Sequence, residues 1–493
     1  MHESIRPTFA PRTLPAIARV FPVLLMIAWM TADPATLSAQ ESSWQEKPTT
    51  LTDQYRDAAA RLIGAALTDD EGWDKFVHLT TQIGHRLSGS EGLEKAIAWA
   101  AETMRAEGLD NVTLQPVMVP HWVRGKEHAR VVSPVERELS MLGLGNSVGT
   151  GPDGIDAPVV VVGSFDELEA LGREAVEGKI VLYAVPWEGY GRTVQYRGGG
   201  ASAAARLGAV AALVRSATGR SLYTPHTGAM NYADDAPRIP AAAVTVEDAA
   251  WMKAMAEAGH TLTVHLYMEA EMLPDVESAN VMAEVTGSEL PDEVVVMGGH
   301  YDSWDVGHGA HDDGAGVMAA WHAVALVKEL GLQPRRTLRV VGWTNEENGL
   351  RGGQAYRDSL GDNVLSHVAA IEMDGGNERP VGFGVTVPGG GSAEDPVQVR
   401  AVELVRQIGR LLDGIEAGQV SFGGGGADIG PIMREGVPGL ALRTVGEHYF
   451  DYHHTNADTI DKIEKVDFQK AVAMLAVMGY VLADMPDTLG DPD

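Results

Sequence analysis

Acidic and histidine side chains follow four short apolar runs in the 493-residue sequence. The runs occupy residues 293–299, 337–343, 368–373 and 438–443, and their β-branched content predicts buried strands. In an open α/β sheet, ligands bind just beyond the carboxyl ends of the strands, so we expect the side chains after these runs to converge. These side chains are His300, Glu346 and Glu347, Asp374, and the His453–His454 pair. The chain has no cysteine, so the available donors are nitrogen and oxygen, which predicts a metal-dependent hydrolase.

Two aspartates in the segment HDDGAG stand at the start of a predicted helix between the first two runs. A carboxylate is favoured at a helix N-terminus, and its two oxygens allow Asp312 or Asp313 to reach two metal ions. Gly314 and Gly316 allow the backbone to approach closely. Imidazole and carboxylate at strand ends suit Zn²⁺, with Co²⁺ or Mn²⁺ as weaker alternatives.

Two further carboxylates have predicted roles other than metal binding. Asp302, two residues after His300, is placed to accept the second ring N–H and fix the tautomer. Adjacent residues after a strand point in different directions, so one of Glu346 and Glu347 can bind metal while the other faces the water between two metals. A carboxylate there can take a proton from the water and pass it to the leaving amine.

Each motif alone also has an ordinary explanation. A single histidine is commonly structural, a Glu–Glu pair commonly lies on a solvated face, and an Asp–Asp pair before a helix commonly caps it. The four motifs occur in order, each after an apolar run, and this joint pattern favours the metal site.

The net charge of −30 at pH 7 excludes nucleic acid and anionic membranes as expected partners. Arg6, Arg12 and Arg19 precede an apolar stretch at residues 20–30 and small residues up to Ala39, which predicts a signal peptide over residues 1–40. The apolar stretch is too short for a comfortable membrane span, so we expect no stable membrane insertion after its removal. The absence of cysteine excludes disulfides, and we expect a secreted or periplasmic protein.

The length predicts two domains, or one large domain with an insertion. Helical patterns occupy residues 50–67 and 91–107, and Pro116 restricts the run at 112–119 to an edge strand. Between residues 126 and 272, strands alternate with helices, one of them expected at 201–207, and no metal-binding side chain follows a strand. We therefore predict an inserted module at 126–272. Residues 41–125 and 273–493 then form an α/β catalytic domain with a mostly parallel central sheet flanked by helices.

The motifs around these residues resemble those of the co-catalytic di-zinc aminopeptidase family. The matching segments are GGHYDSWDVGHGAHDDGAG at 298–316, NEENGLRGG at 345–353, IEMDGG at 371–376 and HHTNADT at 453–459. Segments 191–209, 222–228 and 238–249 resemble the inserted protease-associated domain found in this family. The similarity extends from about Gly84 to the last predicted helix. It implies the zinc exopeptidase fold with an inserted protease-associated domain.

The resemblance also implies roles for individual residues. It implies two Zn²⁺ per chain, one held by His300, Asp312 and Asp374, the other by the bridging Asp312, Glu347 and His454. Glu346 becomes the general base, Asp302 orients His300, and Asp313 matches a supporting position. His454 is chosen over His453 because the family pattern is histidine, threonine, two residues, then aspartate. Tyr449 and Tyr452 are candidates to stabilise the oxyanion, although both can be packing residues.

The resemblance implies an exopeptidase that acts on short peptides with free N-termini, and it suggests a homodimer. One alternative is a di-zinc amidohydrolase acting on N-acyl amino acids. DDGAG disfavours it, because that group usually carries a lysine-containing turn there. The other alternative is a binding protein on an inactive peptidase scaffold, which the complete ligand set disfavours. The glycine run 423–426 departs from the polar loop usual in the family, so the substrate contacts on that side are not defined.

Overall fold

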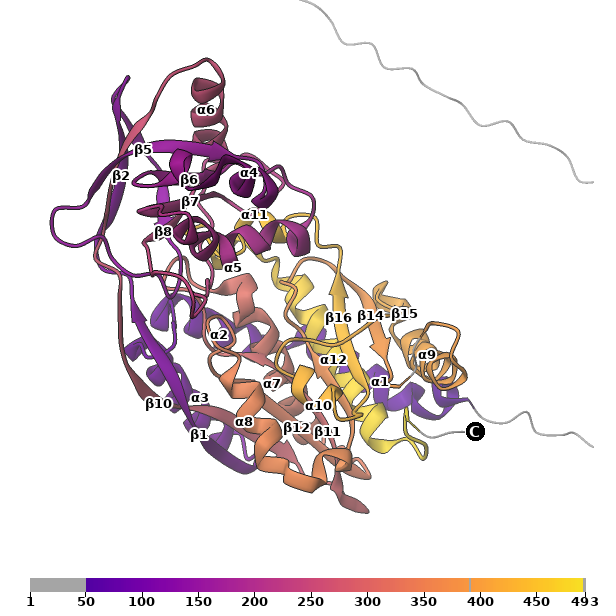
Figure 1. Ribbon diagram of the computed structural model, residues 1–493. Coiled ribbons are helices and arrows are strands. Elements are labelled where there is room, and N and C mark those ends of the chain that lie inside the picture. The colour runs from indigo at the N-terminus through magenta and orange to yellow at the C-terminus, as the bar shows by residue number, and fades with distance from the viewer. Residues whose placement is uncertain (1–49, 390–391, 491–493) are drawn as a thin grey trace, which may run out of the picture. The chain divides into compact units, whose positions relative to one another are not determined.

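The computed structural model describes residues 50–389 and 392–490. Residues 1–40, for which the sequence predicts a signal peptide, lie outside the described part of the chain. Two eight-stranded sheets organise the described residues, and helices cover their faces (Figure 1).

The first sheet carries the four predicted strands and their polar ends. Its order is β1-β10-β12-β11-β13-β16-β14-β15. The strands are β1 (Asp110–Val123), β10 (Glu271–Val285), β11 (Leu290–His300), β12 (Arg336–Trp343), β13 (His367–Glu372), β14 (Pro380–Thr386), β15 (Gln419–Phe422) and β16 (Gly439–Thr444). The central strands β12, β11, β13 and β16 are parallel neighbours, and β14 is parallel to β15. The pairs β1–β10, β10–β12 and β14–β16 are antiparallel. The predicted α/β fold is therefore confirmed, and its central sheet is mixed rather than purely parallel. Strand β1 lies at the edge of this sheet.

Strand β11 is buried on both faces. Val295 and Met297 belong to a core formed with the helices of one face, whereas Val294 and Val296 belong to a second core on the other face. A strand covered on both sides is apolar throughout rather than alternating, which explains the continuous run in the sequence. The first face carries α1 (Leu51–Thr68), α2 (Glu71–Val77), α3 (Glu91–Ala106), α7 (Ala315–Glu329), α9 (Pro396–Gly409) and α12 (Lys465–Asp484), and the second carries α8 (Arg351–Leu360) and α10 (Gly430–Met433).

Helix α12 is the one helix of the described residues that is long and apolar enough to cross a membrane. It packs against α1 and α7, and 78% of its apolar window is buried inside the protein. Its composition therefore fits a central core helix.

The second sheet is built entirely from residues between Glu127 and Met268. Its order is β3-β2-β9-β5-β6-β7-β8-β4, and the parallel run is β5, β6, β7 and β8. The strands are β2 (Glu127–Ser133), β3 (Arg137–Leu139), β4 (Met141–Gly143), β5 (Ile155–Val162), β6 (Ile180–Tyr183), β7 (Ala211–Arg215), β8 (Ala241–Val244) and β9 (Thr263–Met268). Its helices are α4 (Phe165–Val176), α5 (Tyr190–Arg206) and α6 (Val246–Glu257). The boundaries 126–272 and the protease-associated character of this region stay predictions.

Helix α5 begins eleven residues before the predicted helix at 201–207. Three consecutive glycines within it, 198–200, weaken its helical signal in the sequence. A Cβ at Gly200 would lie 2.8 Å from the Tyr183 ring, so a side chain there would have to displace β6. Close packing of α5 on the second sheet therefore requires glycine where helix propensity disfavours it.

Candidate metal centre

The polar residues predicted at the strand ends come together beyond the carboxyl ends of the central strands of the first sheet. His300 is the last residue of β11, and Asp374 follows β13 by two residues. The two glutamates follow β12, and the histidine pair follows β16 and the short helix α11 (Tyr449–Tyr452). Because the central strands are parallel, their carboxyl ends meet at this edge.

The five predicted metal ligands form two groups that share Asp312. In the first group, His300 Nε2 lies 3.3 Å from Asp312 Oδ1 and 3.6 Å from Asp374 Oδ1. In the second group, His454 Nε2 lies 3.1 Å from Asp312 Oδ2 and 3.0 Å from Glu347 Oε2. The two carboxylate oxygens of Asp312 therefore face different groups, which is the arrangement of a bridging ligand.

Several polar atoms of these groups are buried and have no hydrogen-bond partner. They include His300 Nε2, Asp312 Oδ2 and Glu347 Oε1. Buried polar atoms in folded proteins are nearly always hydrogen-bonded, so three such atoms that make no hydrogen bond and lie in one place fit a cation site. Their nitrogen and oxygen chemistry fits zinc.

The protonation of the cluster is consistent with a cation site. Burial raises the pKa of Glu347 to about 7 and also raises the pKa of Asp374. Burial by itself would lower the pKa of His454, but the Glu347 and Asp312 carboxylates outweigh it and raise that pKa to about 9. Without a cation the cluster retains protons, and metal binding has to displace them.

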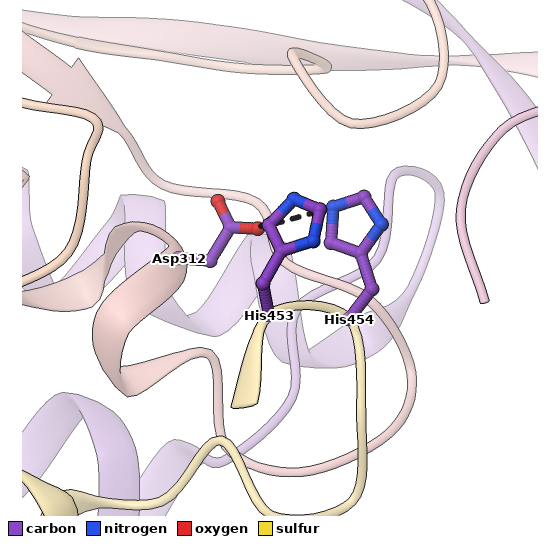
Figure 2. A group of neighbouring side chains, drawn as sticks. All are labelled: Asp312, His453 and His454. Atoms are coloured by element: carbon purple, nitrogen blue, oxygen red, sulfur yellow. Dashed lines mark ion pairs between the residues drawn. The ribbon is translucent and has the colours of Figure 1, made fainter. Parts of the chain in front are cut away.

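His453 lies beside His454 and also approaches the shared aspartate (Figure 2). Its Nε2 is 3.5 Å from Asp312 Oδ2, and the two imidazole rings stack with centroids 3.6 Å apart. Asp312, His453 and His454 are thus close enough to hold one ion together. His454 makes the shorter contact with Asp312 and also contacts Glu347, so the geometry favours His454, as the sequence pattern does.

Asp302 is fully buried and has two separate functions in the structure. Its main-chain carbonyl lies 2.9 Å from His300 Nδ1, whereas its carboxylate is 3.6 Å from the same nitrogen. The ring N–H is therefore accepted by the carbonyl, which leaves Nε2 free for metal. The carboxylate instead accepts the backbone N–H groups of Glu346 and Glu347, at 3.0 and 3.1 Å. Asp302 thus positions both the histidine and the glutamate turn.

Two further aspartates fix the segment around Asp312. Asp313 Oδ2 accepts the His300 main-chain N–H at 3.2 Å and so holds the backbone at the end of β11. Asp458 accepts the N–H groups of His311 and Asp312 at 2.7 and 3.2 Å. A Cβ at Gly316 would lie 1.9 Å from the Met373 carbonyl oxygen, so glycine is needed where α7 meets the end of β13.

Arg86 is a structural residue of the site that the sequence did not identify. It is fully buried and donates to the carbonyl oxygens of Tyr301, His308 and Gly309, at 2.6, 2.9 and 3.0 Å. These bonds hold the loop that connects β11 to Asp312. An arginine bound only to carbonyl groups has no local sequence signature, although it lies in the segment GHRLSG where the family resemblance begins.

The second sheet also contributes to the centre, through residues that the sequence did not identify. The Thr227 N–H donates to the His454 carbonyl at 3.0 Å, and the Thr227 carbonyl lies 3.3 Å from His454 Nδ1. Thr227 therefore holds His454 by its backbone and by its ring. In this orientation the ring Nε2 faces Asp312 and Glu347.

A cleft of about 510 Å³ opens onto the two metal-binding groups. Its lining includes Asp312, Glu346, Glu347, Asp374 and both histidines of the pair, together with Tyr190, Arg197, Tyr449 and Phe450. Glu347 is 7% exposed, whereas Glu346 is only partly buried. Glu346 belongs to neither ligand group and is accessible from the cleft.

Comparison with known proteins gives a consistent result. Peptidase family M28 matches residues 280–478. Carboxypeptidase Q of Mus musculus is 42% identical over 438 residues, which cover 88% of this chain and 91% of the relative. Carboxypeptidase Q of Homo sapiens is also 42% identical, with 88% and 90% covered.

Solved structures also match over most of the chain. A peptidase M28 precursor from Shewanella amazonensis superposes with a TM-score of 0.82 at 33% identity and covers 90% of this chain and 100% of that chain. A zinc aminopeptidase from Bacillus subtilis gives a TM-score of 0.64 at 19% identity, with 86% and 97% covered, and supports the fold alone. The resemblance to a zinc aminopeptidase family, predicted from the motifs, is confirmed, whereas the inserted protease-associated domain stays a prediction.

Proposed function

The chain belongs to peptidase family M28 and is a zinc metallopeptidase, and on this basis we propose that it is an exported di-zinc exopeptidase. Its proposed substrates are dipeptides or short peptides with free N-termini. One observation carries the proposal: the two oxygens of Asp312 face separate ligand groups, and Glu346 stands outside both groups in the same cleft.

In this proposal His300, Asp312 and Asp374 hold one zinc ion, and Asp312, Glu347 and His454 hold the other. Bound zinc supplies a Lewis acid that polarises the scissile carbonyl and lowers the pKa of water. The chain fixes the ligand geometry through Asp302, Asp313 and Thr227, whose contacts orient the two histidines.

Glu346 is the proposed general base. Burial raises the pKa of Glu346 well above its ordinary range, the direction that favours its taking up a proton. Its carboxylate accepts a proton from the attacking water and returns it to the nitrogen of the leaving amine. The bond from its N–H to Asp302 Oδ1 holds the turn in place during both transfers.

Tyr449 is the proposed donor to the developing oxyanion. It lines the cleft, and burial raises the pKa of its phenol well above the ordinary value, so the hydroxyl keeps its proton. Tyr452, the second candidate, stacks on His311 and has the Lys462 ammonium over its ring, which fits a packing residue.

A substrate panel distinguishes this proposal from its two alternatives. The zinc-loaded full chain is assayed with dipeptides, aminoacyl-anilides and N-acyl amino acids. The proposal predicts hydrolysis of substrates with a free amino group. Hydrolysis of N-acyl amino acids alone would instead indicate an amidohydrolase. A zinc-bound protein that hydrolyses none of the three would be an inactive peptidase-like binding protein.

Export and assembly are separate parts of the proposal. Cleavage after the predicted signal peptide gives a mature N-terminus near residues 40–42, and mass spectrometry of protein from the native host tests it. An intact Met1 end would contradict export through this segment.

We also propose a homodimer, which light scattering of the mature protein tests against a monomer.

A further inference from the structure

A buried arginine lies where the chain passes from the first sheet to the second. Arg124 follows Val123, the last residue of β1, and the second sheet begins with β2 at Glu127 (Figure 1). Only 10% of the Arg124 side chain is exposed. A guanidinium is rarely buried unless carboxylates or other acceptors surround it, so its partners show what this junction holds together.

All five N–H groups of the Arg124 guanidinium have an acceptor. Nε and Nη2 donate to the two carboxylate oxygens of Asp305, at 2.8 and 2.6 Å. Nη1 donates to the Gly143 carbonyl at 2.6 Å and to Glu127 Oε1 at 3.3 Å. Nη2 also donates to the Thr227 hydroxyl at 3.4 Å. The paired bonds to Asp305 fix the relative angle of the two side chains as well as their distance.

Asp305 belongs to the segment that carries two of the metal ligands. This segment runs from His300 at the end of β11 to Asp312, and it also packs closely on the second sheet. A Cβ at Gly145, just after β4, would lie 1.9 Å from the ring of Trp304, so the two regions touch with no room for a side chain. The Arg124–Asp305 pair therefore joins the metal-binding segment to the second sheet beside a tight contact.

The other end of this junction is Thr227, whose main chain holds His454. The Thr227 hydroxyl accepts from Arg124 and donates to the Gly143 carbonyl at 2.7 Å, the same carbonyl that Arg124 Nη1 contacts. Continuous contacts thus lead from Asp305 through Arg124 and Thr227 to His454. Since the Thr227 side chain faces the arginine and its main chain faces the histidine, the two ends can be changed separately.

The position of Thr227 matters because the second ligand group depends on the orientation of one ring. His454 Nε2 lies 3.1 Å from Asp312 and 3.0 Å from Glu347, both supplied by the first sheet. The ring is oriented through its Nδ1 by Thr227, which the second sheet supplies. A displacement of the second sheet against the metal-binding segment would therefore turn this imidazole away from the ion.

We infer that Arg124 and Asp305 are positioning residues that hold Thr227 against His454 and so set the affinity of the second ligand group for zinc. This inference rests on the two-ion site of the proposed function. It assigns control of one of the two ions to the junction between the sheets. The first ligand group, whose histidine is oriented by the carbonyl of Asp302, does not depend on this junction.

The zinc dissociation constants of the folded full chain, measured by competition with a chelator, test this inference. Asp305→Asn keeps the side-chain shape and leaves Arg124 paired with Glu127, so no unpaired charge is buried. The affinity for one ion should fall by about threefold to tenfold, less than the about 10–100-fold effect of a group that contacts a metal ligand directly. The other ion should bind as in the wild type. Asp235→Asn, which breaks an exposed paired contact with Arg206, is the matched control and should change neither constant.

A second variant changes the other end of the junction and leaves the buried ion pair intact. Thr227→Val removes the hydroxyl but keeps the main-chain groups that contact His454. It should weaken the same ion to a similar extent, and its combination with Asp305→Asn should lose no more than either change alone, because both act on one path. In His454→Gln, the remaining ion should not respond to Asp305→Asn.

Unchanged zinc affinity in Asp305→Asn and Thr227→Val, equal losses at both ions, or fully additive losses in the double variant would overturn the inference. The two residues would then act on the fold as a whole or not at all. A wild type that binds one ion contradicts the two-ion proposal instead. The affinity for that single ion still decides the role of the junction: similar, non-additive losses in the two variants support it, and unchanged or additive affinities refute it.

Discussion

The two sheets differ in how the polar groups at their strand ends are satisfied. In the first sheet, His300 at the end of β11 and Glu347 after β12 each have a buried polar atom that makes no hydrogen bond. In the second sheet, β7 and β8 are followed by Ser216 and Thr245, whose hydroxyls bond the Val244 carbonyl and the Asp248 N–H. The polar side chains after β7 and β8 thus form hydrogen bonds within the protein, whereas those after β11 and β12 have atoms available to bind a ligand.

The second sheet nevertheless reaches the same site, through residues that are not at its strand ends. Thr227 orients His454, and Arg197 and Tyr190 line the cleft. In the proposed function, the first sheet supplies the metal ligands and the general base, and the second sheet orients His454 and lines the substrate cleft. Changes in the first sheet should therefore affect metal binding or rate. In the second sheet, changes at Thr227 should affect metal binding through His454, and changes at Tyr190 and Arg197 should affect substrate binding.

The largest effect is expected at the residue shared by both ligand groups. Asp312→Ala should lose both metal ions and reduce activity to background, because each group loses a ligand. Elemental analysis and peptidase assays check this, with Asp235→Ala, 70% exposed in the wild type, as the matched control. A variant that keeps two ions would show that Asp312 is not the bridge.

Substitutions of the two adjacent glutamates should affect different properties, the catalytic rate in one case and metal binding in the other. Glu346→Gln should keep both ions while kcat and kcat/KM fall together by about 10² to 10⁴, the usual contribution of general acid–base catalysis, or roughly 3–5 kcal/mol. Glu347→Gln should weaken one metal site, with activity partly recovered in excess zinc. Glu289→Gln, at an exposed carboxylate, is the control. The opposite pattern would reverse the two assignments.

A smaller effect, a loss of stability at low pH, is expected from a histidine at the opposite end of β13 from the metal ligands. His367 is buried against the Tyr356 hydroxyl at 2.7 Å, and burial lowers its pKa to about 4. In the unfolded chain its pKa is about 6.5, so the unfolded state binds the proton more readily and stability falls as the pH drops from about 6.5 to 4. The loss should approach about 3 kcal/mol near pH 4.

Denaturant unfolding of chelator-treated protein at several pH values measures this effect without any contribution from metal. In His367→Gln, which retains an acceptor for Tyr356, this part of the pH dependence should be absent. Parallel losses of stability in the two proteins would place the titrating group elsewhere.

The smallest effect is expected in the second sheet. Tyr190→Phe removes the hydroxyl that holds Arg197 Nη2 but keeps the ring that stacks on Phe450. Loss of one such hydrogen bond should raise KM for a dipeptide by about threefold to tenfold, with kcat and zinc content unchanged. Steady-state kinetics beside Tyr196→Phe check it. A fall in kcat with KM unchanged would contradict a binding role.

The sequence predicted the site best where a ligand lies next to a strand. His300, Glu347 and Asp374 each follow a buried apolar run within a few residues, so a local pattern was enough to locate them. Arg197 and Thr227 could not be found in this way, because each contacts His454 across more than 220 residues of sequence. Only the folded arrangement of the second sheet brings them to the cleft.

The fold was predictable to a similar extent. The apolar runs identified the central strands, because strands covered on both faces have continuous apolar sequences. Strand direction is not encoded in such runs, so the antiparallel pairing of β14 with β16 had to come from the structure. The start of α5 was also missed, since its glycines serve packing against Tyr183 rather than helix formation.

The most direct test of the account is the metal content of active wild-type protein. Elemental analysis should find two zinc ions per chain, and chelation should abolish peptidase activity until zinc is restored. Active protein that contains one ion or none would contradict the shared role of Asp312 and, with it, the proposed mechanism.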